Sequence, residues 1–264
     1  FYFQRKMNLI VGENSLIAGA LQKDWKEKKI EFHCTTRNSN LSNEKVHFYE
    51  AKDNKITLPK KFENIIICIS CTDLNECEKY PRKTRIINVQ AIKNLIDHFH
   101  QSANQIIIFS SSQVFDGSKK NRKVKDKVSP INEYGKQKVE IEKYALNFSN
   151  TSILRLTRVF SFDYIFFKNW KDNLQNNKEI RAFYDYNISP LPIDLLMKKI
   201  NLTIQKRVFG IQHCHGGIPD ISYFDFALSI ADELKCSRSL VKKYSLSKHN
   251  FKYKLQKYSS LLEE

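Results

Sequence analysis

The apolar positions of this chain follow two alternating patterns. Short continuous apolar runs such as Ile65–Ser70 are typical of strands buried on both faces of a sheet. Longer stretches such as Lys83–His100 carry apolar residues at helical spacing. Further strands are predicted at Met7–Val11, Ile30–Thr35, Lys45–Tyr49, Gln105–Ser110 and Thr151–Leu156, and further helices at Leu16–Lys28 and Glu133–Phe148. Strands that alternate with helices in this way predict an α/β protein with a doubly wound parallel sheet.

The pattern changes after Phe160, where aromatic residues become frequent. Two prolines within Ile188–Pro192 predict an extended segment, and Gly210–Gly217 is expected to form a short strand and a turn. Helices are predicted at Phe162–Asn176, Ile193–Gln205 and Tyr223–Lys235. We therefore expect one domain at residues 7–160 and a smaller C-terminal α/β part at residues 161–264, interleaved with the first. The pattern predicts no element in the basic stretch from Lys242 onward.

Composition narrows the class of protein. The opening Phe1–Gln4 resembles the end of a cleavable purification tag, so residues 1–6 are left out of the fold prediction and Met7 is taken as the native start. A hydrophobic content of 41% predicts a globular core. No apolar run reaches the roughly 20 residues that span a bilayer. Six cysteines and no visible secretory signal favour a reducing compartment, so we expect a cytoplasmic protein with no membrane partner.

The chain is strongly basic, with a formal net charge of +16. Because lysines are spread along the whole sequence, we expect phosphate-bearing small molecules rather than nucleic acid as partners. The densest basic run, Lys119–Lys127, is expected in a loop near the candidate site. Cys68 and Cys71 have the spacing of metal ligands, but no second such pair completes the four ligands of a zinc site, so no metal is expected.

One pair of residues points to chemistry. Tyr134 and Lys138 are four positions apart in a predicted helix and therefore share one face. The serine run Ser110–Ser112 ends the preceding predicted strand and can meet this face. A lysine ammonium lowers the pKa of a neighbouring tyrosine, and a serine hydroxyl can polarise a substrate oxygen. Together these residues predict proton transfer to a carbonyl or from an alcohol.

The turn after the first predicted strand suits a dinucleotide. Small residues recur every three positions at Gly12, Ser15 and Ala18, which lets the backbone approach a pyrophosphate at a helix N-terminus. Only the first is glycine, so a plain tight turn is the alternative. Arg37 follows the second strand, and its guanidinium suits the 2′-phosphate of NADP, whereas an acidic residue there would favour NAD. A surface arginine at a strand end is the alternative interpretation.

These motifs resemble those of the extended short-chain dehydrogenase/reductase superfamily. Within it the chain is most similar to the nucleotide-sugar 4-ketoreductases, such as dTDP-4-dehydrorhamnose reductase. The similar segments occur in the family's order over roughly residues 7 to 235, at Gly12–Ala18, Cys71–Asn75, Asn88–Val89, Ser110–Gly117, Pro130–Gly135, Ile153–Arg155, Ser189–Leu195 and Phe224–Ala231. Two of the family's three loop glycines are replaced, and Ile67–Cys71 lacks an aromatic residue that the family has there.

The resemblance implies a Rossmann-like domain at residues 7–160 that binds NADP(H), and substrate binding by residues 161–264. It implies that Tyr134 is the proton donor and that Lys138 holds ribose hydroxyls and adjusts the tyrosine pKa. Ser111 is implied as the catalytic serine, with Ser112 as its rival in register, and Asn88 as a structural support. The residues expected to bind the cofactor are Gly12, Asn14, Ser15, Leu16, Ile17, Arg37, Ile69, Ser70, Tyr134 and Lys138.

The implied reaction is NADPH-dependent reduction of a 4-keto nucleotide sugar in surface polysaccharide biosynthesis. The partner would be a nucleotide-linked sugar, and extended family members often form homodimers through the helix that carries the tyrosine and its neighbouring helix. A nucleotide-sugar 4-epimerase would use the same three residues. A non-catalytic NADP-binding regulatory subunit would keep the same fold. A 4,6-dehydratase is disfavoured, because Ser112 and Gln113 stand where that reaction needs an acid and a base.

Overall fold

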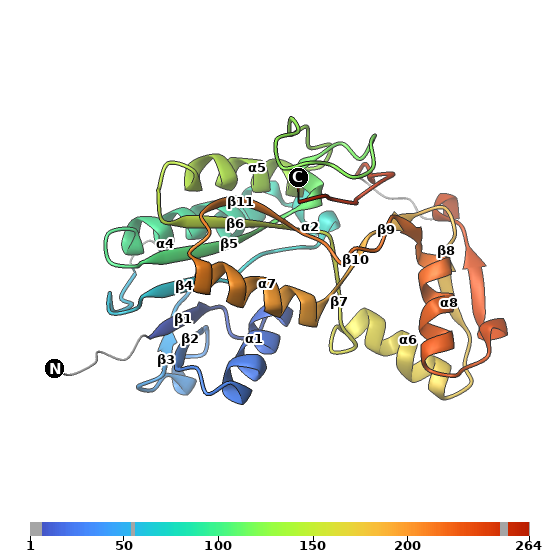
Figure 1. Ribbon diagram of the computed structural model, residues 1–264, viewed down its shortest axis with the longest axis horizontal. Helices are drawn as coiled ribbons and strands as arrows, with labels where there is room; N and C mark the ends of the chain where they lie inside the picture. Colours follow the sequence, from blue (N-terminus) through green and yellow to red (C-terminus); the bar gives the residue numbers. More distant parts are fainter. Residues whose placement is uncertain (1–6, 54–55, 249–252, 264) are drawn as a thin grey trace.

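A seven-stranded parallel sheet forms the centre of the computed structural model, which describes residues 7–53, 56–248 and 253–263 (Figure 1). The strand order is β11-β6-β5-β4-β1-β2-β3, and each neighbouring pair is parallel. The strands are β1 (Asn8–Val11), β2 (Phe32–Thr36), β3 (Val46–Phe48), β4 (Asn64–Ile67), β5 (Gln105–Ser111), β6 (Thr151–Leu156) and β11 (Gly210–Cys214). The predicted α/β fold with a Rossmann-like doubly wound sheet is confirmed.

Helices cover both faces of this sheet. Alternate residues of each strand face opposite layers: Ile65 and Ile106 pack towards α4 and α5, whereas Ile66 and Ile107 pack towards α1 and α7. These helices are α1 (Leu16–Glu27), α4 (Ala91–Phe99), α5 (Glu133–Ala145) and α7 (Ile193–Lys206). Within the described residues, no helix is long and apolar enough to cross a membrane.

The predicted helix Lys83–His100 is three elements in the structure. They are α3 (Pro81–Arg85), the π-helical turn η2 (Ile86–Gln90) and α4. A short helix precedes them, α2 (Leu74–Lys79), in a stretch where no element is predicted. Asp73 starts α2, because its Oδ1 accepts the backbone N–H groups of Asn75 and Glu76 at 2.8 and 3.1 Å. These elements connect β4 to β5, and α2 follows the carboxyl end of β4.

A smaller part with an aromatic core lies to one side of the sheet (Figure 1). Its helices are α6 (Ile165–Gln175) and α8 (Tyr223–Glu233), and its strand pairs are β7 (Arg158–Phe160) with β10 (Pro190–Pro192), β9 (Asn187–Ile188) with β12 (Ile221–Ser222), and β8 (Ile180–Phe183) with β13 (Val241–Tyr244). The short 3₁₀ turns are η1 (Ser39–Leu41), η3 (Ser112–Val114), η4 (Arg238–Leu240) and η5 (Leu246–Lys248). Since β11 pairs with β6, the chain returns to the large sheet between the two halves of this part.

Residues 253–263 run from the smaller part back to the loop after β5 (Figure 1). Gln256 is buried there, and its Nε2 donates to the carbonyl oxygens of Ser112 and Phe115 at 2.9 and 2.6 Å. Nearby, Asp220 accepts hydrogen bonds from the backbone N–H groups of Ser259 and Ser260. This segment therefore joins the smaller part to the loop that carries the candidate serine.

Candidate active site

Tyr134 lies in the first turn of α5, and Asn132 fixes the start of that turn. The Asn132 Oδ1 accepts the backbone N–H of Gly135 at 2.9 Å, and its Nδ2 donates to Gln113 Oε1 at 2.7 Å. A Cβ at position 135 would lie only 2.1 Å from the Gln113 carbonyl oxygen. Glycine at this position thus lets α5 pack directly against η3, which starts immediately after Ser111.

The hydroxyl of Tyr134 meets two serines from neighbouring strand ends. The side chains of Ser70, just beyond β4, and Ser111, at the end of β5, both lie close enough to the Tyr134 hydroxyl to lower its pKa. The Ser110 hydroxyl instead donates to Glu142, and Ser112 is not among the residues that act on the Tyr134 hydroxyl. The structure therefore brings Ser111, rather than Ser112, next to Tyr134.

The pKa of Tyr134 differs from the sequence-based expectation. Burial raises the pKa of the Tyr134 hydroxyl well above its ordinary value, and the neighbouring Cys77 raises it further. The side chains of Ser70 and Ser111 act in the opposite direction but do not outweigh burial. The pKa of Tyr134 is therefore raised rather than lowered, because desolvation dominates.

Lys138 is fully buried one turn further along α5. Its Nζ lies 5.5 Å from the centre of the Tyr134 ring and donates to the carbonyl oxygen of Phe109 at 2.9 Å. Burial lowers the pKa of Lys138 to about 8, although Cys77 and Glu142 counteract this. No ion pair of Lys138 occurs among the residues that the structure describes. Since an ammonium has three N–H donors, two of them are available for a ligand.

Asn88 holds the loop after β4 against α5. It lies in η2 and is completely buried. Its Oδ1 accepts from the Ser70 hydroxyl at 3.0 Å and from the Cys71 N–H at 2.7 Å, and its Nδ2 donates to the Cys71 carbonyl at 2.9 Å and to Gln137 Oε1 at 2.8 Å. Asn88 therefore fixes Ser70 beside Tyr134, in agreement with the structural support that the resemblance implies.

The turn between β1 and α1 has the geometry of a phosphate-binding loop. Gly12 adopts a φ of +94°, and a Cβ there would lie 2.7 Å from Ile69 Cγ2. Ser15 caps α1, since its Oγ accepts the Ala18 N–H at 3.1 Å. The N–H groups of Leu16 and Ile17, in the first turn, have no intrahelical acceptor. Asn14, also in this turn, is exposed.

Arg37 stands directly after β2, next to the β1 strand end that leads into this turn. Its side chain is exposed, and it takes part in no ion pair within the described ranges. The guanidinium is therefore free to meet an anion at the carboxyl edge of the sheet.

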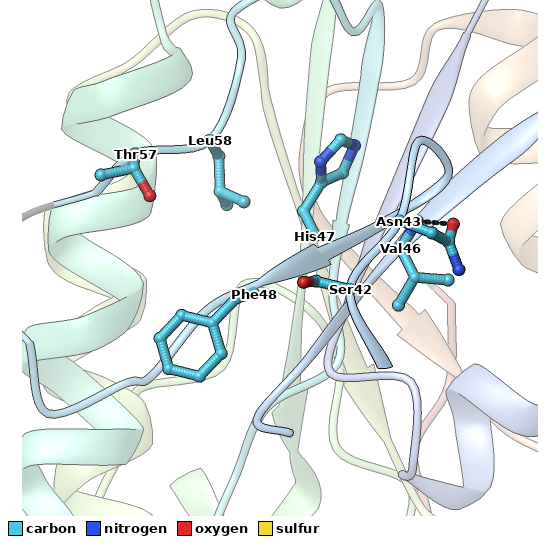
Figure 2. A pocket seen from close by; sticks show the side chains of 7 residues that line it. All are labelled: Ser42, Asn43, Val46, His47, Phe48, Thr57 and Leu58. Carbon is cyan, nitrogen blue, oxygen red and sulfur yellow. Dashed lines mark hydrogen bonds between the residues drawn. The ribbon is translucent and has the colours of Figure 1, made fainter. Parts of the chain in front are cut away.

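Figure 2 shows a hollow elsewhere, at the outer strand β3. Its lining residues are Ser42, Asn43, Val46, His47, Phe48, Thr57 and Leu58. Strands β4, β1 and β2 lie between β3 and β5, so this hollow is remote from Tyr134.

Several residues of the site were not predicted from the sequence. Three residues that the sequence analysis gives no role in ligand binding hold the loop after β5 against α5: Asn132, Gln113 and Gln256. Asn132 could have been found, because an asparagine at the start of a predicted helix is a common N-terminal cap. Gln256 could not, since it follows Ser112 by 144 residues in a stretch without periodicity.

The parallel sheet, the glycine turn after β1 and the grouping of Ser111, Tyr134 and Lys138 define an extended short-chain dehydrogenase/reductase. The family model for the RmlD substrate binding domain matches residues 6–264, so the chain belongs to this family.

Known proteins of two kinds are similar to the chain. It is 28% identical over 202 residues to a dTDP-4-dehydrorhamnose reductase of Aggregatibacter actinomycetemcomitans, which covers 72% of this chain and 68% of that protein. It is 22% identical over 240 residues to the methionine adenosyltransferase 2 subunit beta of Xenopus tropicalis, covering 85% and 71%. A Bacillus anthracis dTDP-4-dehydrorhamnose reductase, solved in complex with NADP, superimposes with a TM-score of 0.85 at 19% identity, covering 98% and 91%.

Proposed function

We propose that this protein uses NADPH to reduce the 4-keto group of a nucleotide-linked sugar, in the biosynthesis of a surface polysaccharide. The observation that carries the proposal is the meeting of Ser111, Tyr134 and Lys138 at the carboxyl ends of the central strands. This edge is where open α/β sheets bind their ligands. The similarity to a dTDP-4-dehydrorhamnose reductase supports the substrate class.

The residues around the site fit NADPH. The free N–H groups at the start of α1, beside Gly12, would hold the pyrophosphate. Arg37, exposed and unpaired among the described residues, would hold the 2′-phosphate. Lys138 would donate its two remaining N–H groups to ribose hydroxyls. When bound here, the cofactor supplies the hydride for the reduction.

The chain's own residues supply the proton and the alignment. The raised pKa keeps Tyr134 protonated at neutral pH, so its hydroxyl can donate a proton to the developing alkoxide. Ser111 donates a hydrogen bond to the same substrate oxygen and orients it. Lys138 is charged below a pH of about 8, where its ammonium stabilises the tyrosinate left after proton transfer. The six free thiols are compatible with a reducing compartment such as the cytoplasm.

NADPH oxidation tests this proposal. The chain is mixed with NADPH and a panel of dTDP- and UDP-linked 4-keto sugars, and the loss of NADPH absorbance is followed. We expect turnover with at least one of them, and a fall of about 10² to 10⁴ in turnover for Tyr134→Phe with cofactor binding retained. Tyr144→Phe, on the outer end of the same helix, is the control. Turnover in Tyr134→Phe equal to that of the control would remove Tyr134 from the mechanism.

A non-catalytic NADP-binding subunit is the second candidate. Two observations favour it: Ser15 and Ala18 replace glycines of the phosphate loop, and a protein named as a subunit of methionine adenosyltransferase is similar over 85% of the chain. Tight NADP binding with no NADPH oxidation by any member of the sugar panel would support this role instead.

A further inference from the structure

Arg158 occupies the junction between the large sheet and the smaller part. It is the first residue of β7, two positions after β6 ends. In the β5–β6 register, Leu156 is the partner of Ser111, so Arg158 leaves the sheet at the same edge as the candidate serine. Its backbone N–H donates to the Ser189 carbonyl at 3.0 Å, which ties it to the segment that leads into β10.

The guanidinium of Arg158 is surrounded by aromatic residues. It lies 5.4 Å from the ring centre of Tyr164 and 5.8 Å from that of Phe167. The Tyr164 and Tyr223 side chains interact with its charge, and Tyr186 stacks on Tyr223 with ring centres 5.5 Å apart. Tyrosine hydroxyls and a guanidinium together form a set of hydrogen-bond donors on an apolar base.

This arginine has no counter-ion among the described residues. The other arginines with little exposed side chain pair with acids: Arg155 Nη2 lies 2.7 Å from Glu142 Oε2, and Arg122 pairs with Asp116. Within the described part of the chain, Arg158 pairs with no carboxylate, and its Nε is shielded from solvent and has no hydrogen-bond partner. A half-buried cation without an acid is costly, so the arrangement calls for an anion from outside the chain.

The strand register relates this cluster to the reaction site. Leu156, the last residue of β6, is the partner of Ser111 in β5. Arg158 follows Leu156 by two positions, so the cluster begins at the sheet edge where Ser111 lies. The charges of Arg158 and Asp73 both act on Tyr253, whose pKa burial raises to about 12.

We infer that Arg158, together with the hydroxyls of Tyr164 and Tyr223, forms the subsite that binds the diphosphate of the nucleotide-linked substrate. The inference rests on the proposed function for the identity of the substrate. A guanidinium presents its N–H donors in a fork that matches phosphate oxygens. The anion supplies the charge that Arg158 lacks, and its position holds the attached sugar towards Tyr134.

Calorimetric titration tests the subsite. dTDP, UDP, dTMP and thymidine are titrated separately into the NADP-saturated parent, Arg158→Gln and Arg158→Lys. Arg181→Gln, which removes an exposed arginine of β8 in the same part, is the matched control. We expect the parent and the control to bind a nucleoside diphosphate more tightly than the nucleoside. Arg158→Gln should lose at least tenfold in diphosphate affinity and little in thymidine affinity, and Arg158→Lys should recover only part of the loss.

Stability separates this role from a structural one. Because no described residue pairs with Arg158 as a counter-ion, Arg158→Gln should unfold near the temperature of the parent and bind NADPH normally. Equal dTDP and UDP affinity in Arg158→Gln and Arg181→Gln would overturn the inference, as would a parent that binds no nucleoside diphosphate. If Arg158→Gln reduces the keto sugar with an unchanged KM, the subsite fails while the proposed function stands. If diphosphates bind through Arg158 but no sugar is reduced, the proposed function fails and the subsite stands.

Discussion

Lys138 is a buried ammonium, and its Nζ donates a hydrogen bond to the neutral carbonyl oxygen of Phe109. Its pKa falls from the ordinary 10.5 of lysine to about 8, so the folded protein holds this proton less tightly than the unfolded chain does. Below about pH 8 the lysine is charged in both states, and folding carries the full desolvation cost. As the pH rises from 8 to 10.5 the folded state loses the proton first, and the free energy of unfolding rises.

The first residue-scale prediction concerns this cost. In Lys138→Met the charge is absent, so the unfolding free energy of the parent relative to the variant should rise by up to about 3 kcal/mol between pH 8 and pH 10.5. Urea denaturation at several pH values measures it. Lys136→Met, which removes an exposed lysine of the same helix, should show no such pH dependence. A parallel pH dependence in the parent and Lys138→Met would show that the lysine is not desolvated.

Arg37 carries the second residue-scale prediction. A hydrogen bond to a charged group contributes about 1.5–3 kcal/mol, so Arg37→Ala should weaken NADP binding at least tenfold and leave NAD binding nearly unchanged. Titration of both cofactors into the variant and into Arg181→Ala decides this. An equal loss for the two cofactors would mean that Arg37 does not contact the 2′-phosphate.

At the scale of elements, regular periodicity was readable from the sequence and irregular turns were not. A continuous apolar run predicted the strand that begins at Gln105, and helical spacing predicted the helix that carries Tyr134. Both elements are present, as β5 and α5. The π-helical turn at Asn88 was missed, because its residues keep a helical pattern and a tertiary network determines the wider turn. Helix α2 was missed because it is too short for its apolar spacing to repeat.

The element-scale prediction concerns the contact between α5 and η3. In Gly135→Ala the new Cβ would lie 2.1 Å from the Gln113 carbonyl oxygen, so one of the two elements must move. Since Ser111 and Tyr134 lie on opposite sides of this contact, we expect a loss of unfolding free energy of about 1–3 kcal/mol and a fall in kcat that exceeds any change in NADPH affinity. Gly19→Ala, where a Cβ meets nothing within 4 Å, is the control. Unchanged kcat in Gly135→Ala would show that the contact does not set the serine–tyrosine distance.

At the scale of the whole molecule, the large sheet could be predicted from the sequence. The contact between residues 253–262 and the loop after β5 could not. Neighbouring strands and helices place Ser111, Tyr134 and Lys138, and each of these lies within one periodic segment. The position of the loop after β5 depends instead on residues 253–262. This segment contacts both parts of the molecule, and its sequence has no helical or strand periodicity. A side chain such as Gln256 is recognisable only when the loop that it meets is already in place.

The whole-molecule prediction tests the contact between Gln256 and the loop after β5. Gln256→Ala removes the donor for the buried carbonyls of Ser112 and Phe115, so the unfolding free energy should fall by about 1–3 kcal/mol and turnover should fall with it. Denaturant titration and NADPH oxidation measure the two effects. Lys254→Ala, which removes an exposed side chain from the same segment, should change neither. A fully stable and active Gln256→Ala variant would show that this contact is not needed to hold the loop after β5 in place.

The bond between Gln256 and Ser112 also has a consequence for biosynthesis. The two residues are 144 positions apart, so during translation the β5 loop is made long before its partner exists. The parallel sheet up to β6 can assemble while the chain grows, because its contacts lie within the part already synthesised. The loop after β5 cannot form its hydrogen bonds to Gln256 until residue 256 has emerged from the ribosome. A nascent chain arrested before that point should therefore contain these sheet strands but lack the complete arrangement around Ser111.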